Sequence, residues 1–198
     1  MEIEKAEKFI VDLLDTQLSS TLYYHGLHHT LDVLNAAMIL ADEEGVEDRT
    51  DLKLLKTAAL FHDSGFLNTY KNHEEEGCRI ANVHLSLFGY SQEEIKKICG
   101  MIMATKIPQT PTTILEQILC DADLDYLGRD DFYTIGNTLY KELLVSGAIN
   151  NEKEWNELQV KFLQGHHYFT DTAQQLRKQP KQARLEEIIA KLSKDNND

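Results

Sequence analysis

The sequence predicts an all-α protein, and three observations carry that prediction. Its 198 residues include only 3 prolines and 10 glycines, so the chain lacks the many turn residues that a series of short strands requires. Apolar residues recur at the three- and four-residue spacing of amphipathic helices. No segment alternates apolar and polar residues as a half-buried strand does. We therefore expect a single-domain helical bundle of about eight or nine helices that spans residues 1–198.

The first half of the chain divides into five expected helices. Gly45 and Gly89 are suitable stops for the second and the fourth. Asp51 is a good N-cap for the third. Ser91, with Glu94 three residues later, forms a capping-box pattern that begins the fifth. The expected ranges are 2–19, 29–44, about 51–62, about 73–88 and about 91–105.

The second half begins after a loop that contains Pro108 and Pro111, and it predicts four more helices. The expected ranges are about 112–127, 130–147, 151–165 and 170–193. The apolar faces of the last helices suit either a core or the seam of a homodimer.

The composition excludes several classes of partner. A formal net charge of −13 repels nucleic-acid phosphates and anionic membranes, so we expect neither. No apolar run approaches ~18 residues, and the acidic N-terminus lacks the features of a signal peptide. Cys78, Cys99 and Cys120 have no spacing that indicates a disulfide framework or a thiolate zinc site. We expect a cytoplasmic protein, and its partner can still be a small phosphorylated molecule because a bound dication reverses the local potential.

Three short segments carry residues suited to chemistry: YHGLHH at 24–29, HD at 62–63 and DADLDYLG at 121–128. Asp63 follows an apolar run, and a carboxylate at the buried end of a helix is costly unless it is paired or binds a cation. Asp121 and Asp123 follow a second apolar run, and Asp121 also suits a capping role. Two imidazoles with two carboxylates suit iron, manganese, nickel, zinc or magnesium rather than a thiolate zinc site.

The order of these segments resembles the HD-domain superfamily of metal-dependent phosphohydrolases. The resemblance covers about residues 20–130, and its flanks read YHGLHHTLDV, LLKTAALFHDSGF, HEEEGCRIA, MIMATK and ILCDADLDYLG. It implies an HD-type bundle with His29, His62, Asp63 and Asp123 as ligands of a divalent metal ion. Asp121 remains the competing assignment for the last ligand.

The resemblance also implies catalytic roles. YHGLHH is similar to the Tyr-His-Asn-x-x-His element of cyclic-nucleotide phosphodiesterases, which makes His25 the acid that protonates the leaving oxygen, although Gly26 replaces the Asn. Asp63 or Asp123 is expected to accept the proton of the attacking water. Apart from the resemblance, Lys106 ends the expected helix at MIMATK and is a candidate ligand for a terminal phosphate.

A second metal ion would need further ligands near the first. His73, just after the metal pair, is the first candidate for such a site. His84 lies on the same helical face, but a plain surface role suits it better.

We therefore expect an enzyme that cleaves a phosphomonoester or phosphodiester bond of a small molecule, a nucleotide by preference, by metal-activated water. The alternative is a regulatory module that binds a metal and a nucleotide without turnover. A purely structural metal site is a third hypothesis. The motifs report the metal site, so they do not choose among metals or substrates.

Overall fold

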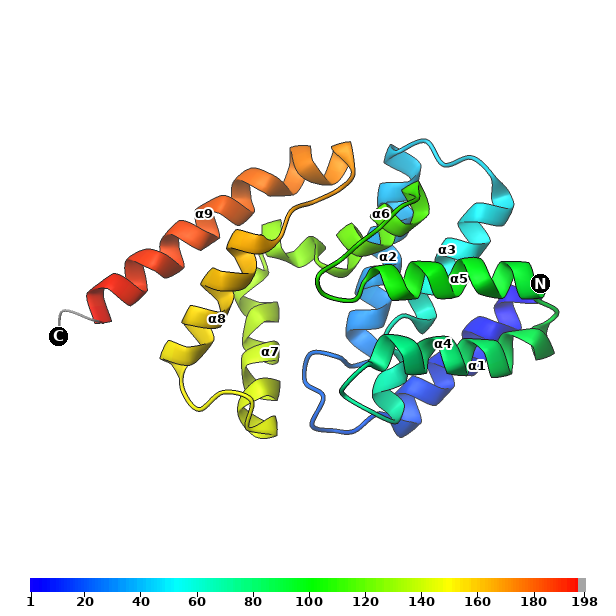
Figure 1. Cartoon of the computed structure of the whole chain (residues 1–198), viewed down its shortest axis with the longest axis horizontal. Helices are drawn as coiled ribbons and strands as arrows, with labels where there is room; N and C mark the ends of the chain where they lie inside the picture. Colours follow the sequence, from blue (N-terminus) through cyan, green and yellow to red (C-terminus); the bar gives the residue numbers. More distant parts are fainter. Residues whose placement is uncertain (196–198) are drawn as a thin grey trace.

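The computed structural model describes residues 1–195, and most of these residues are helical (Figure 1). They form nine α-helices joined by loops and three short 3₁₀ turns, and no strand occurs among them. The predicted fold class is therefore confirmed. The α-helices are α1 (Ile3–Gln17), α2 (Leu27–Glu43), α3 (Arg49–Phe61), α4 (His73–Leu85), α5 (Gln92–Ala104), α6 (Ile114–Asp123), α7 (Phe132–Ser146), α8 (Glu152–Gly165) and α9 (Asp171–Asp195).

The helix starts follow local capping chemistry, with one correction. The capping box of Ser91 and Glu94 is confirmed at the start of α5. The N-cap of α3 is Asp48 rather than Asp51, because the Asp48 carboxylate accepts the backbone N–H groups of Thr50 and Asp51 at 2.8 and 2.9 Å. Asp51 therefore lies inside the first turn, where an acidic side chain interacts well with the helix dipole.

The segment expected as one helix over residues 112–127 is divided in two. Helix α6 ends at Asp123, and a 3₁₀ turn, η3 (Asp125–Gly128), follows it. The turn lies against α9 so closely that a β-carbon on Gly128 would be 2.5 Å from the backbone oxygen of Arg177. The expected continuous helix is thus interrupted by a turn that packs against α9. The sequence around residues 112–127 does not indicate this contact.

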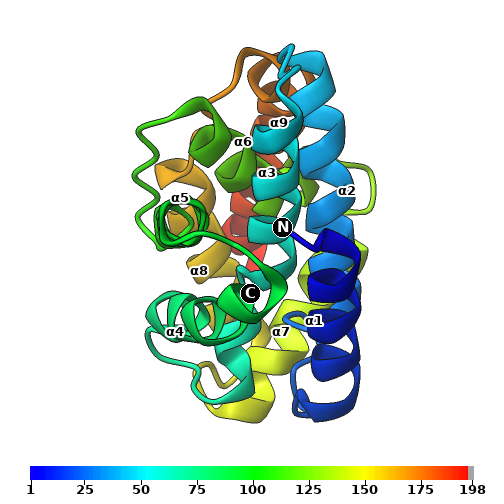
Figure 2. The ribbon, with the colours of Figure 1, turned by 90° about the vertical axis from the view of Figure 1, so that its right-hand side faces the viewer.

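Two groups of helices, each with its own core, make up the described chain (Figure 1). Helices α1–α6 build the larger core, in which α3 lies between α2 and α5 (Figure 2). Helices α7–α9 and the turn η3 build the smaller core. The smaller core consists of Tyr24, Leu124, Tyr126, Leu127, Phe132, Leu163, Leu185 and Ile188.

The two groups are not separate along the sequence. Tyr24 precedes α2 but packs in the smaller core, whereas Tyr168 and Ala173 follow α8 but pack in the larger one. Because each group of helices contributes side chains to the core of the other, the two groups are joined where they meet. None of the helices described is both long enough and apolar enough to cross a membrane.

Candidate metal centre and adjoining cavity

Three helix ends place the four expected ligands. His29 lies in the first turn of α2, and His62 with Asp63 directly follows α3. Asp123 is the last residue of α6. Because α2 packs against both α3 and α6, these ends meet at one place. The local folding of three helices therefore delivers residues that are far apart in the sequence to a single cluster.

The ligand atoms of this cluster lie close together. Oδ1 of Asp123 is 3.2 Å from Nε2 of His29 and 3.5 Å from Nε2 of His62. Oδ2 of Asp63 is 3.4 Å from Nε2 of His29 and 3.2 Å from Nε2 of His62. Among the described residues, His29, His62 and Asp123 form a group whose ligand atoms all lie within 4.8 Å of one another.

Two buried atoms of the cluster have no hydrogen-bond partner, namely Nε2 of His62 and Oδ2 of Asp63. They lie 3.2 Å apart without forming a hydrogen bond to each other. The other ring nitrogen of His62 lies 2.8 Å from the carbonyl oxygen of Ala59 and donates to it, which leaves Nε2 facing the carboxylates. Buried unpaired polar atoms are costly, and one cation would satisfy both of them.

The electrostatics of the cluster also favour a positive charge. Burial by itself lowers the pKa of His62, but the carboxylates of Asp63 and Asp123 outweigh it and raise that pKa well above its ordinary value. Burial raises the pKa of both aspartates, but nearby imidazoles outweigh it and lower both pKa values. These imidazoles are chiefly His62 and His73 for Asp63, and His29 and His62 for Asp123. The residues thus fit a dication, which would take over the role of the proton.

Asp121 has a different environment from Asp123. Its carboxylate accepts the backbone N–H groups of Phe169 and Thr170, at 2.9 and 2.7 Å, and the Thr170 hydroxyl at 2.7 Å. Burial raises the pKa of Asp121 to about 6, although these hydrogen bonds act in the opposite direction. The structure therefore commits Asp121 to the segment before α9 and brings Asp123 to the histidines.

His25 lies beside the cluster and is held by Glu142, a buried residue of α7. Nδ1 of His25 is 2.5 Å from Oε1 of Glu142, and the backbone N–H groups of Tyr24 and His25 donate to Oε2 at 2.8 and 3.2 Å. Burial raises the pKa of Glu142, but these hydrogen bonds outweigh it and lower the pKa below its ordinary value. The ionised carboxylate of Glu142 thus accepts a hydrogen bond from the Nδ1–H group of His25, which leaves Nε2 of His25 free of this contact.

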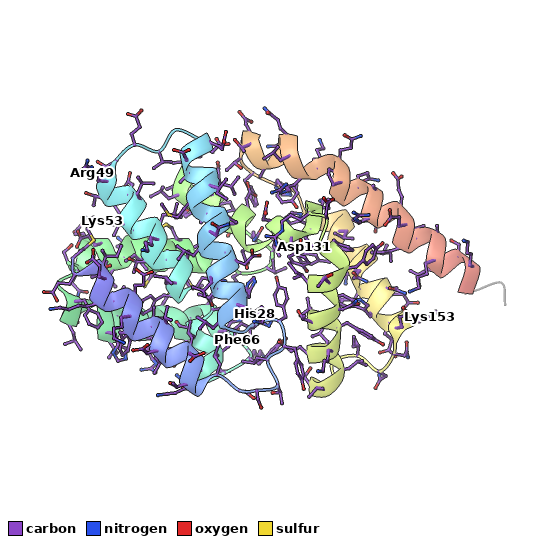
Figure 3. All side chains as sticks on the ribbon, turned by 180° about the vertical axis from the view of Figure 1, so that it is seen from behind. His28, Arg49, Lys53, Phe66, Asp131 and Lys153 are labelled. Carbon is purple, nitrogen blue, oxygen red and sulfur yellow. The ribbon has the colours of Figure 1, made fainter. Side chains whose placement is uncertain are left out.

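The aromatic ring of Phe66 packs against two histidines beside the cluster. The ring of Phe66 stacks on His25, with centroids 4.2 Å apart, and on His73, with centroids 4.1 Å apart. Figure 3 labels Phe66 close to the start of α2. Nε2 of His73 is 3.4 Å from Oδ1 of Asp63. His73 therefore adjoins the cluster, whereas His84 packs on Phe9 farther along α4.

Glu142 was not among the residues that the sequence singled out. It does carry one signal, because Phe132, Ile135, Leu139 and Glu142 follow the three- and four-residue spacing of one helix face. A glutamate on such an apolar face needs a buried partner. Nothing along the sequence identifies that partner as His25, which lies in a loop 117 residues away.

A cavity of about 240 Å³ opens from the cluster into the junction between the two cores. Its polar end holds His25, Asp63, His73, Glu74 and Asp123. Its described lining contains no lysine or arginine, so the carboxylates there have no permanent cation. The opposite wall is apolar and comes largely from α7 and α8, with Phe132, Leu139, Trp155, Leu158, Phe162 and Leu163 among its residues.

Lys106 is not brought to this cavity. Its ammonium group donates to the carboxylate of Glu75 and, at 3.4 Å, to Oδ1 of Asn72, while its neighbours Thr105 and Ile107 do line the cavity. Its expected role as a phosphate ligand stays a prediction, without support from any contact in the described residues.

Comparisons with known proteins identify one matching family and two proteins of similar structure. A sequence model described as the HD domain matches residues 26–125, half of the chain. A protein from an uncultured Thermotogales bacterium, described as a predicted HD superfamily hydrolase, has a similar structure at a TM-score of 0.62. It is 20% identical, and the match covers 96% of this chain and 91% of that one.

A Lactobacillus plantarum protein of known structure is also similar. Its TM-score is 0.67 at 18% identity, and the match covers 98% of this chain and 99% of that one. No match was found among curated proteins. At these identities the two structures establish the likeness of the fold alone.

Proposed function

The chain belongs to the HD domain family, and we propose that it is a metal-dependent phosphohydrolase that acts on a small phosphate ester. The preferred substrate class is a nucleotide. The description of the Thermotogales protein as a predicted hydrolase supports an enzyme rather than a regulatory module without turnover.

One observation carries the proposal: buried, unpaired atoms of His62 and Asp63 converge with His29 and Asp123 at the end of an open cavity. These four residues would hold a divalent ion such as manganese, iron, nickel, zinc or magnesium. When bound, such an ion neutralises phosphoryl charge and acidifies water. A purely structural site is usually closed by protein ligands on every side, whereas this cluster lies at a cavity.

The chain's own residues then divide the proton transfers. In this proposal His25 gives the proton of its Nε2 to the leaving oxygen, and the contact between its Nδ1 and Glu142 supports this role because it holds the ring in one orientation. Oδ1 of Asp63, on the side of its carboxylate that faces His73, is the proposed acceptor of the proton of the attacking water. The apolar wall excludes bulk water and strengthens these interactions.

The aromatic lining supports a nucleotide as the substrate class. Tyr24, Tyr126, Phe132 and Trp155 all border the cavity. Stacking a nucleobase on an aromatic side chain contributes about 1–3 kcal/mol without requiring a particular base. A nucleotide whose base binds among these aromatic side chains would have its phosphate at the polar end of the cavity.

The test is hydrolysis of nucleotides, cyclic nucleotides and an aryl phosphate with each of the candidate metals, with Asp63→Ala measured in parallel. We expect turnover that requires the metal and that Asp63→Ala abolishes. A bound nucleotide that survives long incubation with every metal would instead favour the regulatory module.

A further inference from the structure

A second cavity adjoins the first and belongs to none of the roles described so far. It has a volume of about 330 Å³. Ile107, Leu158 and Phe162 line both cavities, so the same three side chains border each of them. A molecule with its phosphate at the cluster and an extended organic group would pass along these side chains into the second cavity.

The border between the cavities is both apolar and exposed. Ile107 is 55% exposed and Leu158 is 41% exposed. Large aliphatic side chains that face water beside a cavity mark a place where a ligand gains by covering them. Covering these side chains removes apolar area from water, which favours an apolar ligand.

The chemistry of the second cavity indicates what it binds. Its walls include Pro108, Phe162 and Phe169. Of its polar side chains, Gln109 already donates to the carbonyl oxygen of Cys120 at 3.1 Å, and Nδ1 of His166 lies 3.2 Å from the Lys181 ammonium group. Lys161 is the one lysine or arginine in its described lining, and no carboxylate is found there. The cavity thus offers mainly apolar surface, and its remaining polar groups are Lys161, His167 and the unpaired Nε2 of His166.

We propose that the second cavity is a subsite for the far end of the substrate's organic group. The substrate is then a phosphate monoester with a single phosphate and an extended, largely apolar organic group, and a nucleoside monophosphate whose base reaches the second cavity belongs to this class. Additional phosphates would meet the carboxylates of Asp63, Glu74 and Asp123 with no lysine or arginine in the described lining of the first cavity. This inference rests on the proposed function, because the phosphate end orients the ester.

The test uses 4-alkylphenyl phosphates with alkyl chains from methyl to octyl. A 4-alkyl group changes the acidity of the leaving phenol little, so the series varies length at nearly constant chemistry. We expect kcat/KM to rise about threefold to fourfold for each methylene that enters the subsite and to level off once the cavity is full. An equal kcat/KM along the series would overturn the proposal.

Gly165 gives a matched set of variants. It lines the second cavity but not the first, and a β-carbon there would meet no atom within 4 Å. Gly165→Leu should therefore fold normally, fill the subsite and remove the dependence on chain length while leaving phenyl phosphate unaffected. Gly165→Ala should remove only part of the dependence on chain length. Gln164→Leu, on the adjacent residue outside both linings, should leave the dependence intact.

A binding readout separates this inference from the proposed function. Trp155 is the only tryptophan and lines the first cavity, so its fluorescence reports a ligand there without any turnover. Titration with 4-alkylphenylphosphonates should show affinity that increases with chain length in the wild type and not in Gly165→Leu. If no phosphate ester is hydrolysed but this pattern holds, the proposed function fails and the subsite stands. If affinity is independent of length, the subsite is wrong whatever the activity.

Discussion

At the scale of single residues, the site is built from buried charges whose partners are supplied by other parts of the chain. Asp121 and Asp123 are two residues apart, yet one accepts hydrogen bonds from residues 169 and 170 and the other faces two histidines. Glu142 lies far from His25 in sequence and contacts it directly. The two aspartates lead to one prediction, and the contact between Glu142 and His25 leads to another.

The two aspartates should respond differently to the same chemical change. Asp123→Asn should lower manganese affinity by at least about 100-fold, because it removes a charged ligand, and leave the fold intact. Asp121→Asn should leave metal affinity unchanged but lower stability by about 1–3 kcal/mol at pH 8, because an amide cannot accept all of the hydrogen bonds that the carboxylate accepts. Calorimetric titration and urea unfolding measure the two effects. The opposite pattern would assign the ligand to Asp121.

Glu142 should act as a positioning residue for His25. Glu142→Gln should lower kcat by about 100-fold or more, because an uncharged amide no longer stabilises the protonated imidazole, with little change in metal affinity. The pH profile of kcat should change together with its size, because the charge that faces His25 is removed. Glu157→Gln, at an exposed position of α8, is the control. A loss of stability without any change in the pH profile would reduce Glu142 to a structural role.

The same residue predicts a pH dependence of stability. Because the pKa of Glu142 is lower in the fold than its ordinary value of 4.5, the ionised group stabilises the fold above about pH 4.5. This contribution is lost as the pH falls below that value, toward the lowered pKa. The free energy of unfolding of Glu142→Gln should therefore fall less steeply than that of the wild type below pH 4.5, as measured by urea unfolding. Parallel curves for the two proteins would contradict the assignment.

At the scale of elements, close backbone contact sets the position of the turn after α3. Gly65 lies in the 3₁₀ turn η1 (Ser64–Leu67), which packs against the start of α4. A β-carbon at Gly65 would lie 1.9 Å from the backbone oxygen of His73. The glycine thus allows the approach that brings His73 next to Asp63.

Gly65→Ala should accordingly force the start of α4 away from the cluster. Overpacking of this kind costs about 1–3 kcal/mol or more, and here it should also weaken metal binding. Gly136→Ala, inside α7, is the control. A β-carbon at Gly136 would make only ordinary contacts, and the nearest would be with Trp155 of α8 at 3.8 Å. Gly136→Ala should be neutral or stabilise by up to about 1 kcal/mol. Thermal unfolding measures both, and equal stabilities would argue against the close contact.

At the scale of the whole molecule, the site lies where the two groups of helices meet. The expected ligands come from α2, α3 and α6 or the residues that follow them, whereas the apolar wall of the cavity and Glu142 come from α7 and α8. Because each group also contributes side chains to the core of the other, we propose that residues 1–198 form one domain.

One domain should unfold in one transition, and metal should stabilise all of it. Trp155 fluorescence reports α8 and far-ultraviolet circular dichroism reports all helices, so the two probes should give the same Tm. Manganese at ~100 times its Kd should add about 2.7 kcal/mol to the free energy of unfolding and shift both probes together. Asp123→Asn should lose the shift. A shift seen by circular dichroism alone would indicate that α7–α9 unfold independently.

The sequence by itself determined the helical class and most helix starts and stops, because these depend on local capping and periodicity. Its short motifs also proposed the metal ligands by resemblance, with Asp121 and Asp123 still in competition for the last one. Only the tertiary structure separated Asp121 from Asp123, placed Lys106 on Glu75 and paired His25 with Glu142. It also made the two cavities, whose walls join residues from distant helices. The physical reason is that the partners of a buried charge, and the residues that line a cavity, come from segments that are far apart in the sequence. Tertiary packing brings these segments together, and no local sequence pattern indicates which of them will meet.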